Sequence, residues 1–583
     1  MKSLLKILFL SALMFTCLAG NAQRKRNAAR QNKLAQARQP KKPAKPTKQA
    51  AATTTVTNEP VKLSQDTTKP NVVTITSAFK PSLRSAAKIN FTASTPDLDT
   101  NRFSLNYSIP AQNLIFSYQP VPIKPLALTS DSDFTWQNHQ YIKAGFGNLT
   151  TPYFETGLAF GHPASALYTV FGKFVSSKGN EVFQEYANAQ LKVSSAFGGI
   201  TNHDLLASLS YNLSNQNKYG VKANTVHTKD SLAQNFNTIE ADISLHSKTE
   251  NSYGISYHPQ IKASAFFDNN QANETNIALK APFTKSFTAT TSFVLGINAD
   301  ITSYKNATTK IDNNIFSIAP SLKMSAVDYK INIGVQPTWD NSVFAFLPNI
   351  NGEYRLAEAF ALTAGWVGSF QKNTYKTLAA INPFIEQPSS LVNTKVNEIY
   401  GGIKGGVGKH FTFNGQVSFL KLTNQALFVN NAVDSKSQTF NILYEPDLKA
   451  IRIGGEIGYT DKEKFSLLSS IKYTQFTSQQ LYPKAYGFVP LEINASAKYK
   501  LLKDVFIKSD LFMFAGNYYR VQTIQTEKTS AAFDLNLGVE FKVLKNLNAY
   551  IDFNNLFNNK YQRWNQYNVF GFNVVGGIVY SFH

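Results

Sequence analysis

Hydrophobic and polar residues alternate over long stretches of the second half of the chain, most clearly in residues 531–543. One face of this stretch is apolar and consists of Phe533, Leu535, Leu537, Val539, Phe541 and Val543. The other face is polar and consists of Asp534, Asn536, Gly538, Glu540 and Lys542. Successive side chains of a strand point to opposite faces, so the stretch predicts a strand with one apolar side. Repeated strands of about ten residues or more with this pattern are typical of a β-barrel with lipid outside and water inside.

The same alternation continues from Tyr141 to the end of the chain, in ascending and descending segments. We count about 22 segments, a number within the range of membrane barrels. No apolar run of about 20 residues follows residue 22, so the sequence predicts no transmembrane helix. We therefore predict that residues 140–583 form an all-β, transmembrane antiparallel β-barrel in the outer membrane.

The assignment of faces makes a prediction for single residues. Val505, Ile507 and Leu511, like Leu537, are expected to face lipid. An arginine at Leu537 would then cost about 2–4 kcal/mol near the bilayer midplane. An arginine at the neighbouring Asn536 would face water and is expected to cost much less.

Three short segments with one shared pattern predict the periplasmic turns. They are Tyr354–Phe360, Tyr499–Val505 and Phe541–Leu547. In each, an aromatic residue and a base close one strand, a tight polar turn follows, and a new apolar alternation begins. Aromatic rings and basic groups at strand ends suit a membrane–water boundary.

The connections on the other side are longer and richer in polar residues. The clearest are Asn215–Gln234, Lys372–Lys395, Leu422–Lys449 and Phe557–Asn568. Short turns inside and long loops outside are the usual asymmetry of an outer-membrane barrel. A barrel of about 22 strands encloses a wide lumen. The candidates to obstruct it are residues 72–139 and inward-folded long loops, mainly Lys372–Lys395 and Leu422–Lys449.

Residues 1–22 are predicted to be a secretory signal peptide. Lys2 and Lys6 precede an apolar core at Ile7–Ala19, and small residues end the segment at Ala22. Cys17 lacks the small preceding residues of a lipidation signal, and it is the only cysteine in the chain. The predicted mature chain therefore has no disulfide, thiol nucleophile or cysteine-based metal site.

The positive charge of the chain is concentrated near its N-terminus. Residues 1–50 hold 12 of the 58 basic residues and no acidic ones, which leaves 46 basic against 37 acidic residues, a net charge of +9. The excess lies in Arg24–Lys48, where charge repulsion and prolines predict a disordered linker over residues 23–70. The linker is either simply solvated or contacts an anionic surface or periplasmic partner. We assign it no nucleic acid, because an exported chain meets lipid phosphates and peptidoglycan first.

Residues 71–139 gain hydrophobic residues but are repeatedly interrupted by proline. We predict an irregular periplasmic or lumen-lining segment here, because proline breaks both helices and ladders.

Two motifs near the ends of the predicted barrel resemble those of a known family. One is the stretch Asn555–Tyr561 with Trp564 and the terminal strand to Phe582; the other is Ala144–Asn148. They resemble the closing signature and the first hairpin of TonB-dependent receptors of the Bacteroidetes type. The outward face of the terminal strand, which ends at Phe582, also resembles the signal read by the outer-membrane barrel assembly machinery. The resemblance covers residues 140–583 and implies a barrel of about 22 strands that transports solutes.

The chain departs from that family before the barrel. Family members carry a folded plug of well over a hundred residues, whereas residues 71–139 show no plug pattern. Val72–Thr76 matches a TonB box no better than any β-prone pentapeptide, which leaves TonB open as a partner. The sequence thus predicts a transport or translocation barrel, with a gate that a partner could supply. The alternative is a non-transporting scaffold subunit of an envelope complex.

Motifs for catalysis or cofactor binding are not found. Ser85–Lys88 matches S-x-x-K without its partner motifs, and Asp97–Asp99 and Asp131–Asp133 offer too few oxygens for a hard cation. The eight histidines have no metal-ligand spacing. We predict no catalytic, cofactor or metal residues and no enzyme activity, and the sequence identifies no substrate-binding residue.

The predicted lumen wall carries charges of both signs, which can pair across neighbouring strands. The residues concerned are Arg452, Glu456, Glu492, Lys498, Lys508, Asp510, Asp534, Glu540, Lys542 and Asp552. The simpler interpretation is a hydrated, ion-paired wall, and the alternative is a substrate path.

Overall fold

The computed structural model describes residues 140–582, except residues 199, 221–227, 432–438, 463 and 522–524. The predicted signal peptide (1–22), basic linker (23–70) and irregular segment (71–139) lie outside the described residues, as do Ser85–Lys88, Asp97–Asp99 and Asp131–Asp133.

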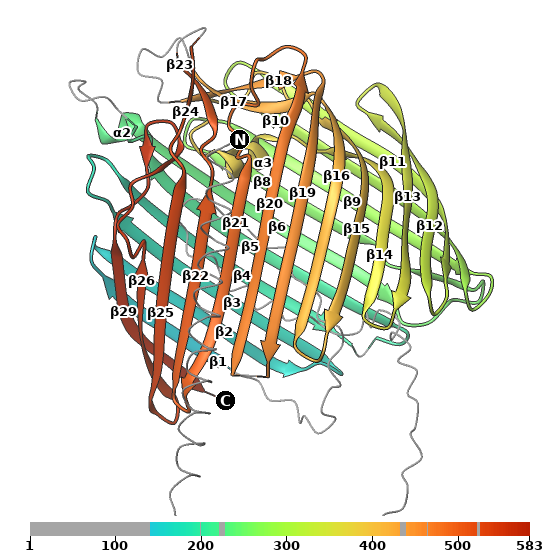
Figure 1. The fold of residues 1–583 in the computed structure, drawn as a ribbon, viewed down its shortest axis with the longest axis horizontal. Coiled ribbons are helices and arrows are strands. Elements are labelled where there is room, and N and C mark those ends of the chain that lie inside the picture. Colours follow the sequence, from blue (N-terminus) through green and yellow to red (C-terminus); the bar gives the residue numbers. More distant parts are fainter. Residues whose placement is uncertain are drawn as a thin grey trace, which may run out of the picture. The chain divides into compact units, whose positions relative to one another are not determined.

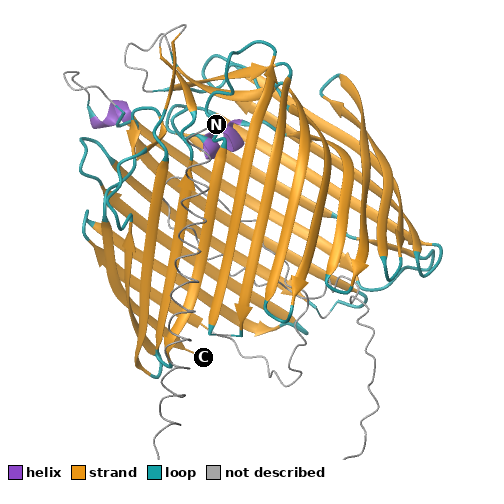
Figure 2. Cartoon of the chain, in the orientation of Figure 1, coloured by secondary structure: helices purple, strands orange, loops and turns teal. Residues whose placement is uncertain are grey.

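The described strands form a closed antiparallel barrel (Figures 1 and 2). The ring closes where β1 (Gln140–Gly147) pairs with β29 (Asn573–Phe582), in eight residue pairs. β7 (Ile255–Tyr257) and β8 (Gln260–Asp268) share one place in the ring, because both pair with β9 (Asn273–Ser286). The 23-stranded sheet therefore has 22 places, which confirms the predicted barrel of about 22 strands.

The other ring strands follow one another along the chain. They are β2 (Thr151–His162), β3 (Ala166–Lys178), β4 (Glu185–Phe197), β5 (His203–Asn217), β6 (Ala233–Ser247), β10 (Thr291–Lys305), β11 (Lys310–Ser325), β12 (Tyr329–Asp340), β13 (Val343–Ala357), β14 (Phe360–Gln371), β15 (Thr394–Val407), β16 (Phe411–Thr423), β19 (Leu448–Asp461), β20 (Phe465–Gln479), β21 (Leu491–Leu502), β22 (Val505–Phe514), β25 (Ala532–Leu544) and β26 (Leu547–Asn554).

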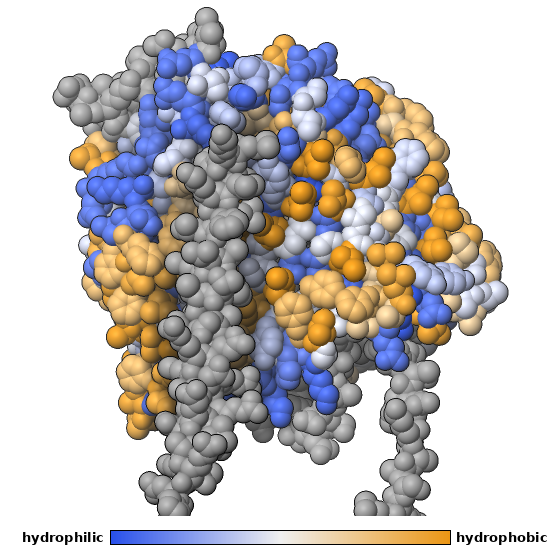
Figure 3. All heavy atoms as spheres, in the orientation of Figure 1, coloured by the Kyte–Doolittle hydropathy of each residue, from blue (hydrophilic) through white to orange (hydrophobic). Residues whose placement is uncertain are grey.

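The alternation of each strand separates an outer apolar face from an inner polar one. On β25, Phe533 and Phe541 are exposed outward, whereas Asp534 is buried on the inner side. Val505, Ile507 and Leu511 pair with the outward residues of β25 and share their face, as predicted. On the face that Figure 3 shows, many hydrophobic residues lie over the middle of the barrel wall, and hydrophilic residues gather above them. This apolar outer face and the barrel fold place the chain in the outer membrane.

Asn536 lies on the predicted inward face, but the expected contact of its side chain with water is not found. Asn536 faces inward, but it is only 8% exposed and its Oδ1 accepts a hydrogen bond from the backbone N–H of Asn555. An arginine there would not simply enter water, because it would displace that contact. Asn536→Arg is therefore not a suitable control for an arginine at the outward position Leu537.

The three predicted turns have one geometry. Two residues separate the strands in each, at 358–359, 503–504 and 545–546. A bulge precedes each turn, where the register shifts around Leu356, Leu501 and Val543. These bulged residues expose apolar side chains at the edge of the apolar outer face. We call this end of the barrel the turn end and the opposite end the loop end; the usual asymmetry predicts that the loop end is extracellular.

The ladder between β11 and β12 is interrupted. The ladder runs to Ser317↔Thr338 and resumes at Ser321↔Gly334. Pro320 and Pro337 lie in the gap on the outer face, and proline has no N–H to donate to a ladder.

The four predicted long connections lie at the loop end and contain structure of their own. They hold α2 (Lys229–Leu232), α3 (Tyr375–Ile381), the hairpin β17 (Gln425–Asn430) with β18 (Phe440–Glu445), and the pair β27 (Gln562–Trp564) with β28 (Tyr567–Asn568). Two further long connections, residues 480–490 and 515–531, were not predicted from the sequence. The second holds β23 (Tyr518–Val521) and β24 (Gln525–Lys528). Among the described residues, no helix is long and apolar enough to cross a membrane.

Candidate functional site: a loop cap over the barrel mouth

The main hydrophobic core of the described residues lies at the loop end, where the long connections pack together. We call the described parts of residues 372–393, 424–447 and 555–572, together with Tyr219, the loop cap. It packs on buried wall residues of β6, β8 and β10. The core consists of Tyr219, Phe236, Phe266, Ala272, Tyr304, Tyr375, Leu378, Ala379, Phe384, Ile385, Leu391, Ala426, Phe428, Phe440, Trp564 and Tyr567.

Aromatic contacts join parts of the cap that rise from different sides of the ring. The rings of Phe384 and Tyr567 stack with centroids 3.4 Å apart, and Tyr219 meets them edge-on at 6.1 Å and 5.1 Å respectively. The three residues belong to connections spaced roughly a third of the ring apart in the strand order. Loops that start this far apart can meet only across the mouth, so the cap spans it.

Trp564 is the largest fully buried side chain of the cap. It packs edge-on against Phe428 and Phe440, with ring centroids 5.3 Å and 5.4 Å away. The Arg563 guanidinium lies 4.3 Å from the Trp564 ring, and burial lowers its pKa to about 10. The hairpin β17–β18 is thereby joined to the last connection before β29.

Helix α3 follows β14 and reaches β9 and β6, which lie five and seven places away in the ring. Thr374 and Thr377 form a reciprocal capping box at its start. The carboxylate of Glu274 on β9 accepts the backbone N–H of Tyr375 at 2.6 Å, and the Lys376 ammonium pairs with Glu240 on β6 at 2.8 Å. These contacts hold the helix inside the mouth, as expected for Lys372–Lys395.

Tyr375 makes the apolar contacts between helix α3 and the wall. Its ring meets those of Phe236, Phe266 and Tyr304 edge-on, at 6.0, 5.2 and 5.6 Å. Its hydroxyl donates to Asp268 at 2.8 Å. Burial, followed by the nearby Asp268 carboxylate, raises the pKa of Tyr375.

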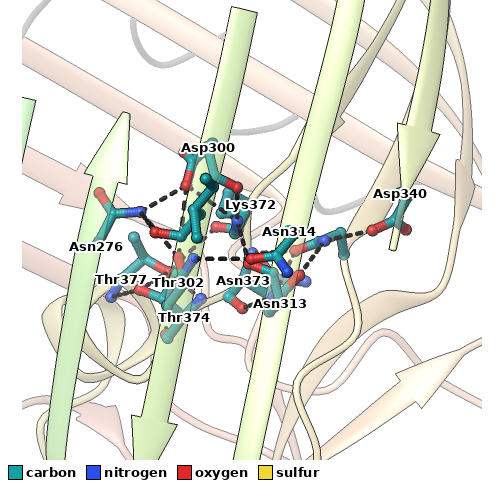
Figure 4. Close-up of polar contacts among 12 residues, drawn as sticks. Asn276, Asp300, Thr302, Asn313, Asn314, Asp340, Lys372, Asn373, Thr374 and Thr377 are labelled. Carbon is teal, nitrogen blue, oxygen red and sulfur yellow. Dashed lines mark hydrogen bonds and ion pairs between the residues drawn. The ribbon is translucent and has the colours of Figure 1, made fainter. Parts of the chain in front are cut away.

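Lys372, the first residue of the same connection, binds to the wall (Figure 4). Its ammonium donates to the carbonyl of Asp300 at 2.9 Å, to the Asp300 carboxylate at 3.0 Å and to the carbonyl of Asn313 at 2.6 Å. Burial lowers the pKa of Lys372, although the Asp300 charge opposes this effect. One side chain thus clamps the connection to both β10 and β11.

Asparagine side chains complete the anchor. Asn313 on β11 donates to the carbonyl of Asn373 and to Oδ1 of Asn393, both at 3.0 Å. Asn393 donates in turn to Asp340 on β12 at 2.6 Å. Asn313, Asn373 and Asn393 are fully buried, so each amide needs the partners that the others supply. Sequence reasoning missed these residues, because asparagines in loops and strand ends give no periodic signal.

The family-like motif Asn555–Tyr561 has a structural role here. The Asn555 side chain donates to the carbonyls of Asn559 and Phe570 and accepts from the N–H of Asn559. Tyr561 donates to the buried Asp534 at 2.9 Å. The motif therefore fixes the start of the last connection on top of β25 and β26.

The inner wall below the cap is polar and ion-paired. All ten charged residues predicted for the lumen lie on the inward side of their strands. Cross-strand ion pairs include Lys472–Glu492 at 2.8 Å, Lys508–Glu540 at 3.5 Å and Lys143–Asp552 at 3.2 Å. Such pairs suit a wall that contacts water.

The histidines are less scattered than the sequence indicates. The rings of His246 and His258 lie 4.8 Å apart, and His203 bonds the hydroxyl of the adjacent Tyr257. The register of β5 with β6 brings His203 near His246, and the pairing of β6 with β8 brings His258 near His246. Their spacing along the chain conceals this. Within the part of the chain that the structure describes, no group of three or more histidine, cysteine or acidic residues could hold a metal ion.

Known proteins resemble the chain in fold and not in sequence. No protein-family model and no curated protein sequence matches the chain. Solved structures do match. The FrpB iron transporter of Neisseria meningitidis has a TM-score of 0.60 at 10% identity, with 77% of this chain and 82% of that chain covered. The chain has the barrel fold of a TonB-dependent receptor.

Two further receptors share this TonB-dependent receptor-like barrel. The pyoverdine outer-membrane receptor FpvA of Pseudomonas aeruginosa PAO1 has a TM-score of 0.59 at 10% identity, covering 77% of this chain and 79% of its own. The siderophore receptor PirA of Acinetobacter baumannii has a TM-score of 0.58 at 9% identity, covering 76% and 80%. At these identities the likeness describes the fold of the barrel.

Proposed function

We propose that the chain is an outer-membrane transport or translocation barrel in which the loop cap obstructs the extracellular end. The observation that supports this proposal is the cap itself, assembled from three sides of the ring over a polar, ion-paired wall. A ring of this size encloses a wide lumen. A scaffold that used only its outer face and loops would need neither a hydrated inner wall nor a cover.

The contacts of the cap suggest how it opens. Its aromatic core is buried and holds the loops to one another, and through Tyr375 it also packs on Phe236, Phe266 and Tyr304 of the wall. Its polar links to the wall run through Lys372, Lys376 and Glu274. Opening would have to separate both the packing at Tyr375 and these polar links, while the aromatic contacts among the loops would keep the rest of the cap together.

We propose that the remaining parts of the chain serve the same process. Residues 1–22 would direct export, residues 23–70 would form a basic periplasmic arm, and residues 71–139 would line the lumen in place of a normal plug. This makes the chain a Bacteroidetes-type relative of the TonB-dependent receptors without their plug. A periplasmic partner would supply the gate, and TonB is one candidate. Lipid and, through the strand ending at Phe582, the barrel assembly machinery are the other expected partners.

Planar-bilayer recording tests the role of the cap. We expect the full chain to conduct weakly and the Lys372→Met variant to show larger, more frequent openings, because the variant loses the clamp to β10 and β11. Lys310→Met is the matched control: its pair with Asp312 is exposed and lies at the rim, 3.9 Å apart. Equal currents from all three proteins would contradict the proposal.

The alternative function is a non-transporting scaffold subunit of an envelope complex. It predicts electrical silence in every variant and stable co-purification with partner proteins from the native envelope. The loop cap favours transport, because a scaffold gains nothing from anchoring its loops inside the lumen.

A further inference from the structure

A partly open cavity of about 50 Å³ lies on the inner face of the ring closure. Strands from both ends of the barrel sequence line it, on either side of β1, and Phe570 and Gly571 of the loop cap border it. Its lining consists of Thr151, Tyr153, Lys173, Val175, Ser177, Tyr186, Asp552, Asn554, Phe570, Gly571, Asn573 and Val575.

Glycines let the two strands of the seam approach closely. A Cβ on Gly147 of β1 would collide with the carbonyl of Val574, and one on Gly577 of β29 would collide with the carbonyl of Ala144. β1 contributes no side chain to the lining. Residues of β2 and β3 therefore face residues of β26 across β1 and β29.

Lys173 presents a buried cation to the cavity. The residue is 8% exposed, and its ammonium lies 5.6 Å from the ring of Tyr153. No carboxylate among the described residues lies within ion-pair distance of it. Glu155 is the cross-strand neighbour of Lys173 and acts on its charge from beyond ion-pair distance. Burying an ammonium that has no direct ion pair is costly, so the site favours an incoming anion.

The two nearest carboxylates are already engaged. Glu155 accepts the hydroxyls of Tyr141 at 2.8 Å and Tyr153 at 2.6 Å. Asp552 pairs with the ammonium of Lys143 at 3.2 Å. Neither has to leave its partners for an external anion to bind Lys173.

An unsatisfied acceptor lies on the same lining. Asn554 donates from Nδ2 to Asn573 at 3.2 Å, which fixes the orientation of its amide. Its Oδ1 is buried and has no hydrogen-bond partner. The cavity therefore offers a cation and, separately, an acceptor that needs a donor.

We propose that this cavity binds the oxyanion group of a ligand, a carboxylate or phosphate, through Lys173, with a donor of the same ligand on Asn554. A volume of about 50 Å³ admits such a group but not a whole sugar or peptide. The rest of the ligand lies in the lumen. Because Phe570 and Gly571 border the cavity, an occupant also contacts the loop cap.

The inference rests on the proposed function only for the route by which a ligand reaches the lumen. Equilibrium binding to the purified chain requires no transport. A negative binding result would leave the transport proposal intact, and electrical silence would leave the binding site intact.

Calorimetric titration of the detergent-purified full chain tests the site, with inorganic phosphate and with succinate at constant ionic strength. We expect saturable binding of at least one anion. In Lys173→Met the Kd should rise about ten- to hundredfold, since a charge-assisted bond is lost. Lys192→Met is the matched control, because Lys192 lies on the inner face of β4 outside the cavity. Phosphate binding alone would identify a phosphate ligand, and succinate binding alone a carboxylate ligand.

Asn554→Asp is a second cavity variant, which tests the binding site if Lys173→Met does not fold into a barrel. It is isosteric and retains Lys173 but adds a negative charge to the lining, so it should also weaken binding. Absence of saturable binding in the full chain would overturn the proposal. Equal weakening by Lys173→Met and Lys192→Met, or unchanged binding in both cavity variants, would overturn it as well.

Discussion

The two ends of the barrel are built on different principles. At the turn end, two-residue turns with a preceding bulge repeat at residues 358–359, 503–504 and 545–546, and each depends on its own few residues. At the loop end, connections from three sides of the ring depend on one another through one aromatic core. A substitution at the turn end should therefore act locally, whereas one in the cap should act on several loops at once.

The largest effect is expected for Trp564→Ala. The indole is 1% exposed and packs on Phe428 and Phe440, so its loss should destabilise the cap by about 3–5 kcal/mol. Residues 424–447 and 555–572 should both become protease-sensitive in the folded barrel. Tyr499→Ala, at the turn end, should leave both loops protected. If cleavage were confined to residues 555–572, the loops would not form a single unit.

A smaller effect is expected in the wall that joins the two ends. Ile471 on β20 is 45% exposed on the outer face, and Ile471→Arg should cost about 2–4 kcal/mol near the midplane. The neighbouring residue Ser470 faces inward and pairs with Glu456 on β19, so Ser470→Arg should cost much less. Unfolding by denaturant in lipid vesicles measures both. Equal destabilisation would contradict the assignment of faces.

The smallest effect is expected for Asn555→Ala. It removes three hydrogen bonds that hold the last connection and should cost about 1–3 kcal/mol. Hydrogen exchange should rise across residues 555–572 and spread to the hairpin β17–β18. Asn546→Ala, in a two-residue turn, should change exchange only next to itself. A purely local response to Asn555→Ala would show that the motif does not support the cap.

This difference between the ends also decides what could be predicted from sequence. The barrel and its turns follow from period-two alternation and local turn residues, so Leu537, Ile507 and the turn at Tyr499–Val505 were placed correctly. The inward fold of Lys372–Lys395 followed from the size of the lumen. The contacts of the cap could not be predicted, because Tyr219, Phe384 and Tyr567 are brought together by ring closure. The burial of Asn536 was not predicted, because it depends on a hydrogen bond from Asn555 at the start of the last connection.

The central claim is that the loop cap limits passage through the barrel. Single-channel conductance tests it most directly, in a set of four proteins: the full chain, Lys372→Met, a deletion of residues 72–135, and the two changes combined. We expect the deletion to raise conductance and Lys372→Met to raise it further in both backgrounds, because the cap obstructs the lumen independently of those residues. The claim would be contradicted if the deletion alone gave the conductance of the combined variant, so that Lys372→Met had no added effect.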